Sequence, residues 1–316
     1  MNTVSEISYY CKIDKSMQNA LFLKAQGDDP RPLLVGLHTW SYDHTNGSDK
    51  YVELCIENNW HFIFPDFRGG NTRPDACGSE MVVSDLEDAV AYMKNTVNVD
   101  RTRVYLAGGS GGGHCSLLMA GRRPDLWTAV SSWCPISDIA AWHQECLARN
   151  RGYYAHIESV CGGSPADSEA AAKEAVKRSP LTWLSNVKES ALKLDISTGI
   201  HDGHIGSVPV SQAINAFNVV ARQEDRISQA DIDFIVKNES VPEHLKATEQ
   251  DPSFGGRTIY LRKISGNVRL TLFEGGHDLL QNAAIDWLAR QSREKMPDWN
   301  PGREHAESEI SVELSK

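Results

Sequence analysis

The chain has 316 residues, of which 41% are hydrophobic and 23% are charged, a composition typical of a globular protein with a large core. Its formal net charge of −10 disfavours nucleic acid and anionic membrane surfaces as partners. No stretch approaches the roughly 18 apolar residues of a membrane span, and no apolar signal segment begins the sequence. We therefore expect a cytoplasmic protein that binds a small molecule, with no membrane and no nucleic-acid partner. A secreted or periplasmic protein trimmed of its leader would have the same sequence features.

The seven cysteines include no closely spaced pair, so neither a zinc site nor a thiol redox pair is predicted. Free thiols that pack as small hydrophobic side chains are the first interpretation. A disulfide between Cys146 and Cys161 is the alternative for an exported protein.

Strand and helix signals alternate along most of the chain. Short apolar runs predict buried parallel strands at residues 33–37, 61–65, 103–107, 129–133, 194–200 and 268–273. Apolar residues at helical spacing predict helices at about 49–58, 84–97, 114–122 and 279–290, and Ser84 with Glu87 fits a capping box. The alternation predicts a single α/β domain over residues 1–316, with a mostly parallel central sheet flanked by helices.

Three segments depart from this alternation. Residues of about 138–182 and 222–262 are too long for simple connections, and we expect them to form cap-like inserts. The polar and acidic residues of about 297–316 predict a poorly ordered tail.

A glycine-rich turn is the strongest motif in the sequence. Gly108 to Gly112 reads G-x-S-x-G and stands between a predicted strand and a predicted helix. So sharp a turn holds its central serine in a strained conformation that only small neighbours tolerate. Ser110 is therefore the candidate nucleophile, and the backbone N–H of Gly111 is a candidate oxyanion donor at a helix N-terminus. A phosphate-binding loop is disfavoured because no lysine follows the glycines.

The candidate base and acid follow the last two parallel strands. His277 comes after the last predicted strand, from which a loop can bring its imidazole over the nucleophile. Asp202 follows the strand before it, where a carboxylate would orient the imidazole and stabilise its charged form. Asp195 begins that strand and is expected to be structural, and the side chain of Asp278 is expected to point away from the ring.

A second oxyanion donor is expected in the loop after residues 33–37, most simply the backbone N–H of Trp40. His201 and His204 flank Asp202 and could also be interpreted as metal ligands, but no third ligand group is evident. No metal and no cofactor are therefore predicted.

Several side chains belong to segments that we expect to overhang the site. The candidate substrate-binding residues are His38, Tyr42, Trp133, Trp142, Tyr153 and His204. Flat aromatic faces with polar edges suit a sugar or a phenolic acid. Core packing is the alternative interpretation for each aromatic ring.

These motifs together resemble the catalytic domain of prolyl-oligopeptidase-type hydrolases (peptidase family S9-like), within the α/β-hydrolase superfamily. The resemblance covers roughly residues 30–290 and is carried by Gly108 to His114, by Ser179-Pro180-Leu181, and by Asp202 followed by Val208-Pro209. Five residues separate Asp202 from Val208, where the family usually has two. The resemblance implies an α/β-hydrolase fold and serine-hydrolase activity. Oligopeptidases of this family carry a β-propeller before the domain, for which the residues before the first core strand are too few.

Single-domain relatives of this type are commonly carbohydrate acyl esterases or feruloyl esterases, so the resemblance implies a serine esterase that removes an acetyl or feruloyl group through an acyl-enzyme. A peptidase or aminoacyl amidase is the alternative, with Glu145 and Arg149 as candidate anchors for a peptide terminus. A catalytically silent binding module of the same fold is disfavoured because all three triad positions hold competent residues.

Overall fold

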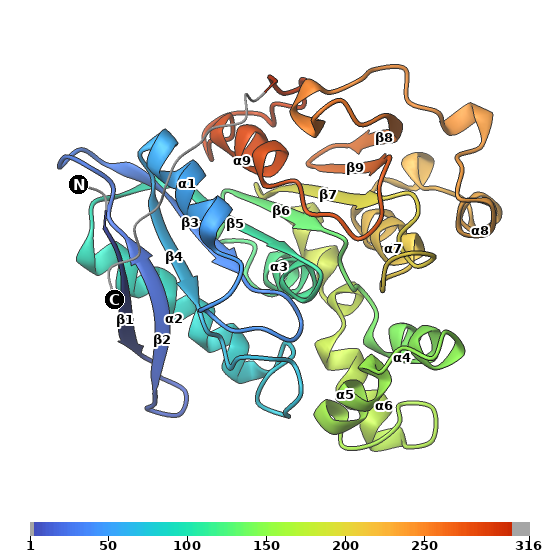
Figure 1. Cartoon of the computed structure of the whole chain (residues 1–316), viewed down its shortest axis with the longest axis horizontal. Coiled ribbons are helices and arrows are strands. Elements are labelled where there is room, and N and C mark those ends of the chain that lie inside the picture. The colour runs from blue at the N-terminus through green and yellow to red at the C-terminus, as the bar shows by residue number, and fades with distance from the viewer. Residues whose placement is uncertain (1–2, 305–316) are drawn as a thin grey trace.

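The computed structural model describes residues 3–304, and within this range nine strands form one sheet in the order β1-β2-β4-β3-β5-β6-β7-β9-β8 (Figure 1). The strands are β1 (Val4–Tyr10), β2 (Met17–Leu23), β3 (Arg31–Leu37), β4 (His61–Pro65), β5 (Val99–Gly109), β6 (Ala129–Trp133), β7 (Lys193–Gly199), β8 (Ile259–Ser265) and β9 (Val268–Phe273). The six strands from β4 to β9 in the sheet order pair in parallel, and antiparallel pairs close both edges.

Helices cover both faces of this sheet. On one face lie α1 (Asp49–Asn58) and α9 (Gln281–Ala289), and on the other lie α2 (Glu80–Thr96), α3 (Gly111–Arg122) and α7 (Val210–Val220) (Figure 1). Parallel strands with crossover helices on both faces, in this strand order, define the α/β-hydrolase fold. The predicted fold class is confirmed. Within residues 3–304, no helix is both long and apolar enough to cross a membrane.

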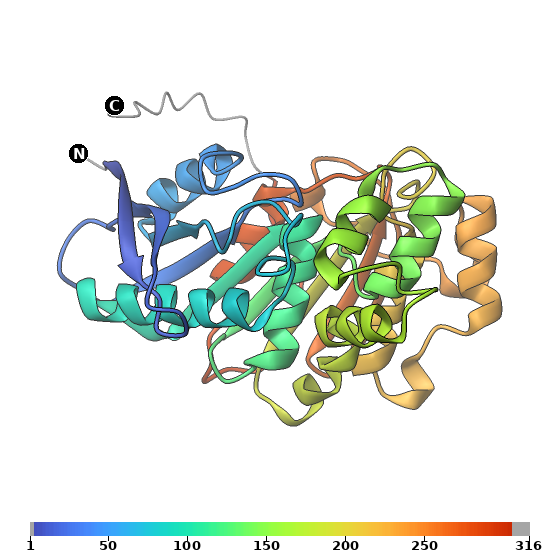
Figure 2. The same ribbon diagram turned by 90° about the horizontal axis from the view of Figure 1, so that it is seen from below.

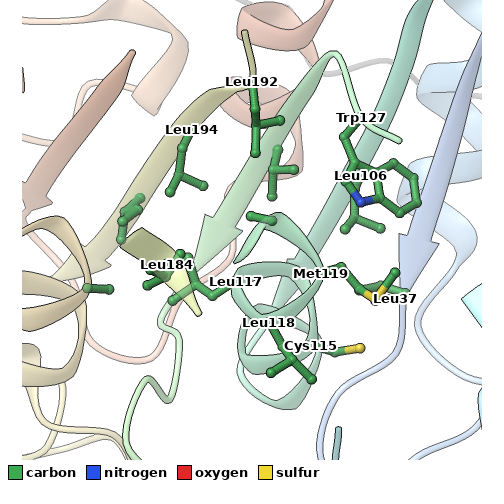
Figure 3. Packing of buried hydrophobic residues seen from close by; sticks show 14 of the residues in the cluster. Leu37, Leu106, Cys115, Leu117, Leu118, Met119, Trp127, Leu184, Leu192 and Leu194 are labelled. Atoms are coloured by element: carbon green, nitrogen blue, oxygen red, sulfur yellow. The ribbon is translucent and has the colours of Figure 1, made fainter. Parts of the chain in front are cut away.

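The helix that follows Ser110 is buried along its whole length. Leu117 and Met119 of α3 pack in one apolar cluster with Leu37 of β3, Leu106 of β5 and Leu194 of β7 (Figure 3). Burial of side chains this large, each worth roughly 1.5–3 kcal/mol, fixes the helix against the sheet. The turn that begins α3 is therefore held rigidly at the carboxyl edge of the strands.

All six predicted parallel strands are present, whereas three strands of the sheet edges were missed. β1, β2 and β8 are partly exposed and carry polar or charged residues on one face, such as Glu6 and Ser8 of β1. Continuous apolar runs are typical of strands that are buried on both faces, so this signal is absent at the edges. Helix α7 was missed as well, although it packs in the main core.

Helix α2 begins one turn earlier than predicted. Its N-cap is Ser79, whose side chain accepts a hydrogen bond from the backbone N–H of Val82. Ser84 lies inside the helix, so the predicted capping box of Ser84 and Glu87 is wrong. Ser84 and Glu87 have the S-x-x-E spacing of a capping box by chance, because they lie inside the helix rather than at its N-terminus.

The first insert contains α4 (Ile139–Ala148), α5 (Tyr153–Cys161) and α6 (Glu169–Arg178), which pack together beside the carboxyl ends of the strands (Figure 2). The second insert contains α8 (Gln229–Asn238) and the start of β8. All seven cysteines are buried and free, and Cys146 and Cys161 lie in the same apolar cluster.

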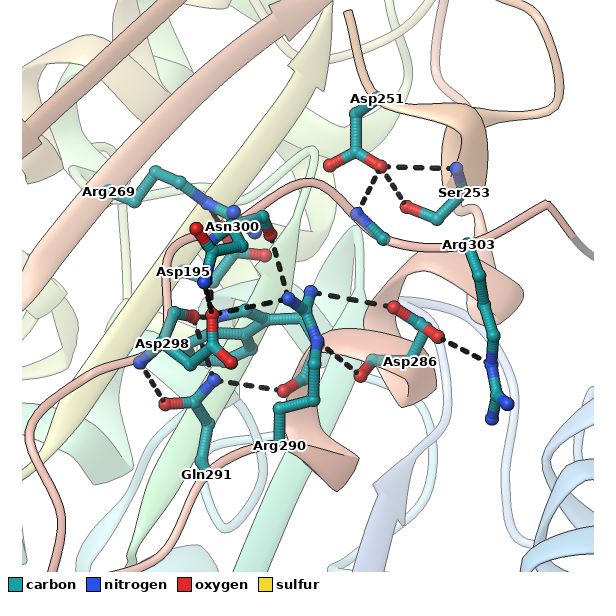
Figure 4. Close-up of polar contacts among 12 residues, drawn as sticks. Asp195, Asp251, Ser253, Arg269, Asp286, Arg290, Gln291, Asp298, Asn300 and Arg303 are labelled. Carbon is teal, nitrogen blue, oxygen red and sulfur yellow. Dashed lines mark hydrogen bonds and ion pairs between the residues drawn. The ribbon is translucent and has the colours of Figure 1, made fainter.

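The prediction of a poorly ordered tail over residues 297–316 is wrong for residues 297–304, which pack against the domain. The ring of Trp299 stacks on Trp287 with centroids 5.4 Å apart, and Arg290 donates to the carbonyl of Asn300 at 2.8 Å (Figure 4). These contacts tie residues 297–304 to α9. The remaining predicted tail, 305–316, lies outside the described residues.

Candidate active site

Ser110 occupies a strained turn between β5 and α3, with φ 57° and ψ −119°. A residue with a side chain rarely adopts a positive φ, and such strain persists only where surrounding structure enforces it. The backbone N–H of Ser110 donates to the carbonyl of Trp133 at 2.9 Å. A Cβ on Gly108 would lie 2.5 Å from the carbonyl oxygen of Gly112, so the turn needs glycine there.

His277 and Asp202 form a hydrogen-bonded pair in which the carboxylate is buried and the imidazole is partly exposed. The Nδ1 atom of His277 lies 2.8 Å from Oδ2 of Asp202, whose side chain is fully buried. Because the carboxylate can only accept, Nδ1 carries the proton and Nε2 keeps its lone pair. Nε2 is buried and has no hydrogen-bond partner among residues 3–304, and Ser110 Oγ does not yet bond to it there. In unliganded enzymes this contact is often long and tightens when substrate binds.

The carboxylate of Asp202 is held by the loop that follows it. Its Oδ1 accepts hydrogen bonds from the backbone N–H of Gly203 at 2.9 Å and of Val208 at 3.2 Å. Although the loop between Asp202 and Val208 is longer than usual for the family, it still brings the backbone N–H of Val208 back to the carboxylate of Asp202.

Gly206 makes the return of this loop feasible. A Cβ at Gly206 would lie 2.1 Å from Oδ1 of Asp202 and 2.8 Å from Cβ of His277. Sequence reasoning did not single out this glycine. The only available signal was a glycine in the part of the loop that exceeds the family's usual length.

Two backbone N–H groups meet beside Ser110. A Cβ on Gly111 would lie 2.5 Å from the backbone nitrogen of Trp40, so these two peptide groups are in close contact. Among the described residues, neither N–H is paired with a hydrogen-bond acceptor. This is the arrangement that binds a developing oxyanion, and it brings together both predicted donors.

His38 supports this oxyanion loop, and its side chain is buried and inaccessible to a substrate. Its two ring nitrogens lie 2.9 Å from the carbonyl of Thr39 and 2.8 Å from that of Asp66, and its ring stacks on Phe67 at 3.9 Å. Burial lowers the pKa of His38. The prediction that His38 binds substrate is corrected, because the side chain is only 1% exposed.

Trp133 and Trp142 are corrected in the same way, since both side chains are buried. The indole of Trp133 donates to Ser131 at 2.9 Å and packs against Phe254 and Phe273. Trp142 lies in the apolar cluster of the first insert. Aromatic character alone did not separate a core ring from a surface ring.

The other three candidate substrate-binding residues retain some exposure. Tyr42 is 55% exposed directly after the oxyanion loop, and Tyr153 stacks on Trp142 at 5.3 Å. His204 contacts α8 instead, with Nε2 2.6 Å from the carbonyl of Val236. Substrate binding by these three residues stays a prediction.

The two aspartates that were not assigned to the triad are paired with arginines. Asp195 lies 2.8 Å from Nε of Arg269 and is buried, and Asp278 lies 2.6 Å from Nη1 of Arg257. The buried ion pair of Asp195 agrees with its expected structural role.

Within residues 3–304, one group of side chains has ligand atoms close enough to hold a metal: Cys134, Asp202 and His277. The last two are already hydrogen-bonded to each other, and burial raises the pKa of the Cys134 thiol well above its usual value. A thiol that stays protonated is a poor ligand, so the geometry fits an acid–base pair better than a metal site. His201 lies 2.8 Å from Glu239 and 3.1 Å from Glu274, and Nδ1 of His204 lies 3.5 Å from the same Glu239 carboxylate.

A polar hollow of about 260 Å³ adjoins the oxyanion loop. Its lining includes Ser41 and Tyr42, which directly follow Trp40, and Thr72 and Arg73 from the loop after β4. Hydroxyl and guanidinium groups in such a hollow can hydrogen-bond a polar ligand.

The fold and this constellation define a serine hydrolase of the α/β-hydrolase class. The sequence profile described as "Prolyl oligopeptidase family" matches residues 50–234, and the chain therefore belongs to this family. A search of curated proteins found no match.

Solved structures with the same fold include peptidases and a puromycin hydrolase. The acylaminoacyl peptidase of Pyrococcus horikoshii is 13% identical with a TM-score of 0.62, over 95% of this chain and 43% of that one. A puromycin hydrolase is 14% identical with a TM-score of 0.59, over 91% and 38%. A putative dipeptidyl aminopeptidase IV from Bacteroides ovatus is 14% identical with a TM-score of 0.57, over 92% and 35%. The chain thus spans less than half the length of each of these proteins.

Proposed function

We propose that the protein hydrolyses carboxylic esters through an acyl-enzyme, with Ser110 as nucleophile, His277 as general base and Asp202 as orienting acid. The observation that carries this proposal is the buried Nε2 of His277, which has no hydrogen-bond partner in the described part of the chain, while Asp202 fixes the other ring nitrogen at 2.8 Å. Nε2 takes the proton of Ser110 as Oγ attacks the acyl carbon, and returns it to the leaving alcohol. The N–H groups of Trp40 and Gly111 bind the oxyanion. Water then repeats these steps on the acyl-enzyme.

A polar alcohol, such as a saccharide, is the leaving group that the surroundings favour. The hollow next to the oxyanion loop is lined by hydroxyl, carboxylate and guanidinium groups, including Tyr42, Asp43 and Arg73. Sugars present hydroxyl groups that such side chains can hydrogen-bond. An acetyl or feruloyl ester of a saccharide is therefore our first substrate class.

A peptidase or aminoacyl amidase is the second candidate. It is favoured by the names of the similar structures, which include acylaminoacyl peptidase and puromycin hydrolase. Glu145 of α4 is a half-buried carboxyl that accepts from Gln212 at 2.9 Å, and burial raises its pKa to about 7. A carboxylate at this place would suit a peptide ammonium group.

The experiment compares wild type with Ser110→Ala on acetylated xylan oligosaccharides and on aminoacyl p-nitroanilides. Acetate release by the wild type alone supports the ester proposal. Cleavage of the anilides without acetate release would favour the amidase, and equal rates in both proteins would exclude Ser110 as the nucleophile. Tyr42→Phe is the matched test of the hollow, because it removes one hydroxyl from an exposed ring. We expect it to raise KM for saccharide esters and to leave p-nitrophenyl acetate hydrolysis unchanged.

A further inference from the structure

We propose that Trp142 is a positioning residue that holds both the acid and the oxyanion donor of the site. The inference rests on the proposed function of Ser110, His277 and Asp202. Trp142 belongs to α4 in the first insert, far in sequence from the residues it contacts, and its side chain is buried.

The indole N–H of Trp142 fixes the peptide that holds the acid. Nε1 donates to the carbonyl of Ser207 at 3.0 Å. The nitrogen of the same peptide group is that of Val208, whose N–H donates to Oδ1 of Asp202 at 3.2 Å. A peptide is planar, so fixing its carbonyl also fixes the direction of its N–H. Hydrogen bonds in such a chain also polarise one another.

The ring of Trp142 contacts the oxyanion loop at the same time. Its centroid lies 4.7 Å from that of Trp40 with an interplanar angle of 71°, an edge-to-face contact. Tyr153 stacks on the ring of Trp142 with centroids 5.3 Å apart. The indole N–H of Trp40 donates to Nδ1 of His156 at 3.3 Å. The side chain of Trp40 is thus held by the first insert while its backbone N–H faces Gly111.

One side chain therefore joins two parts of the site that must keep a fixed relative position. Oxyanion stabilisation and proton transfer both depend on sub-ångström placement. A further tie comes from Arg149, also in the first insert, whose guanidinium donates to the carbonyl of Gly203 beside Asp202. On this account the first insert supports catalysis as well as bordering the site.

The two contacts of Trp142 can be separated by substitution. Trp142→Phe keeps a ring against Trp40 and loses the N–H, whereas Trp142→Leu loses both. Trp287→Phe is the matched control: Trp287 is a buried indole whose Nε1 donates to the carbonyl of Asp298 at 3.1 Å, away from the site. For each protein we would measure the rate constant for covalent labelling of Ser110 by a fluorophosphonate, kcat and KM for p-nitrophenyl acetate, and Tm. Labelling would be measured well below the Tm of every variant, where nearly all molecules are folded, so the rate constant reports the site rather than the stability.

We expect Trp142→Phe to lower the labelling rate constant and kcat about tenfold, the rate equivalent of one lost hydrogen bond, with KM nearly unchanged. Trp142→Leu should lower the labelling rate constant and kcat further. Trp287→Phe should lower Tm without changing the labelling rate constant. If both Phe variants lower Tm alike and neither changes the rate constant, the positioning role is overturned while the proposed function stands. If the wild type itself is not labelled, the proposed function fails and this inference with it.

Discussion

Two buried aspartates stand at opposite ends of β7, and they have different partners. Asp195 lies at the start of the strand, 1% exposed, and pairs with Arg269 of β9 at 2.8 Å. Asp202 follows the end of the strand, is equally buried, and pairs with His277 at the same distance. The guanidinium of the first pair lies 5.3 Å from the ring centroid of Trp299 in the C-terminal segment, whose polar contacts are drawn in Figure 4, and the second pair belongs to the candidate active site.

The comparison shows that the partner, rather than burial, decides what a buried carboxylate can do. Arginine is charged at every accessible pH, so the pair of Asp195 and Arg269 cannot exchange a proton and serves structure. Histidine can hold or release a proton near neutral pH. Within residues 3–304 the Nε2 of His277 has no hydrogen-bond partner, which leaves the second pair competent for proton transfer.

Replacing the acid tests the second pair and has the largest expected effect. Asp202→Asn keeps the shape of the side chain but turns its amide N–H toward His277, which favours the wrong tautomer. We expect kcat to fall about 10³- to 10⁴-fold, with only a small change in the free energy of unfolding. Steady-state kinetics and urea unfolding measure both. A fall of tenfold or less would indicate that another group orients the imidazole.

Gly206→Ala tests the close approach on which the same pair depends. The added Cβ would stand 2.1 Å from Oδ1 of Asp202, so the loop must shift and the carboxylate with it. We expect kcat to fall about 10²-fold or more, since a displacement of this size misaligns the base. Ser207→Ala, in the same loop, is the control and should retain most activity. Wild-type kinetics in Gly206→Ala would contradict the described loop.

Asp195→Asn tests the structural pair and should show the reverse pattern. It leaves the charge of Arg269 buried without a counter-charge, which costs about 3 kcal/mol or more of unfolding free energy. We expect chemical denaturation to show this loss while the fluorophosphonate labelling rate constant stays at its wild-type value. A loss of labelling rate with intact stability would invalidate the distinction between the two aspartates.

His114 gives a smaller, pH-dependent effect on stability. It is buried at the start of α3, where burial lowers its pKa to about 4 from 6.5, and its Nε2 donates to the carbonyl of Arg178 at 2.8 Å. Between these two values the unfolded chain binds the proton and the folded chain does not. The titration of His114 therefore does not reduce the free energy of unfolding above pH 6.5, and it lowers this free energy progressively as the pH falls toward 4.

His114→Gln removes this titration and keeps a donor. Between pH 6.5 and 4 we expect the unfolding free energy of the wild type to fall by about 3 kcal/mol more than that of the variant. Urea unfolding at several pH values measures the difference. Parallel curves for the two proteins would show that His114 does not titrate in this way.

The sequence was sufficient for those parts of the molecule that depend on local pattern. The parallel strands follow from continuous apolar runs, and the places of Ser110, Asp202 and His277 follow from where strands end. The edge strands lack this pattern because one face meets solvent. The role of Trp142 and the need for glycine at Gly206 depend on contacts between distant segments, which no local pattern reveals. For the same reason the burial of His38 and Trp133 was not predicted.

The central claim is that Ser110 is activated by His277, and it is tested most directly by covalent labelling. Purified wild type, Ser110→Ala and His277→Ala would be treated with a fluorophosphonate probe, and the modified residue identified by peptide mass spectrometry. The account predicts labelling of wild type at Ser110 alone, none in Ser110→Ala, and a labelling rate lower by about 10³-fold or more in His277→Ala. Equal labelling of wild type and Ser110→Ala, or full labelling of His277→Ala, would contradict it.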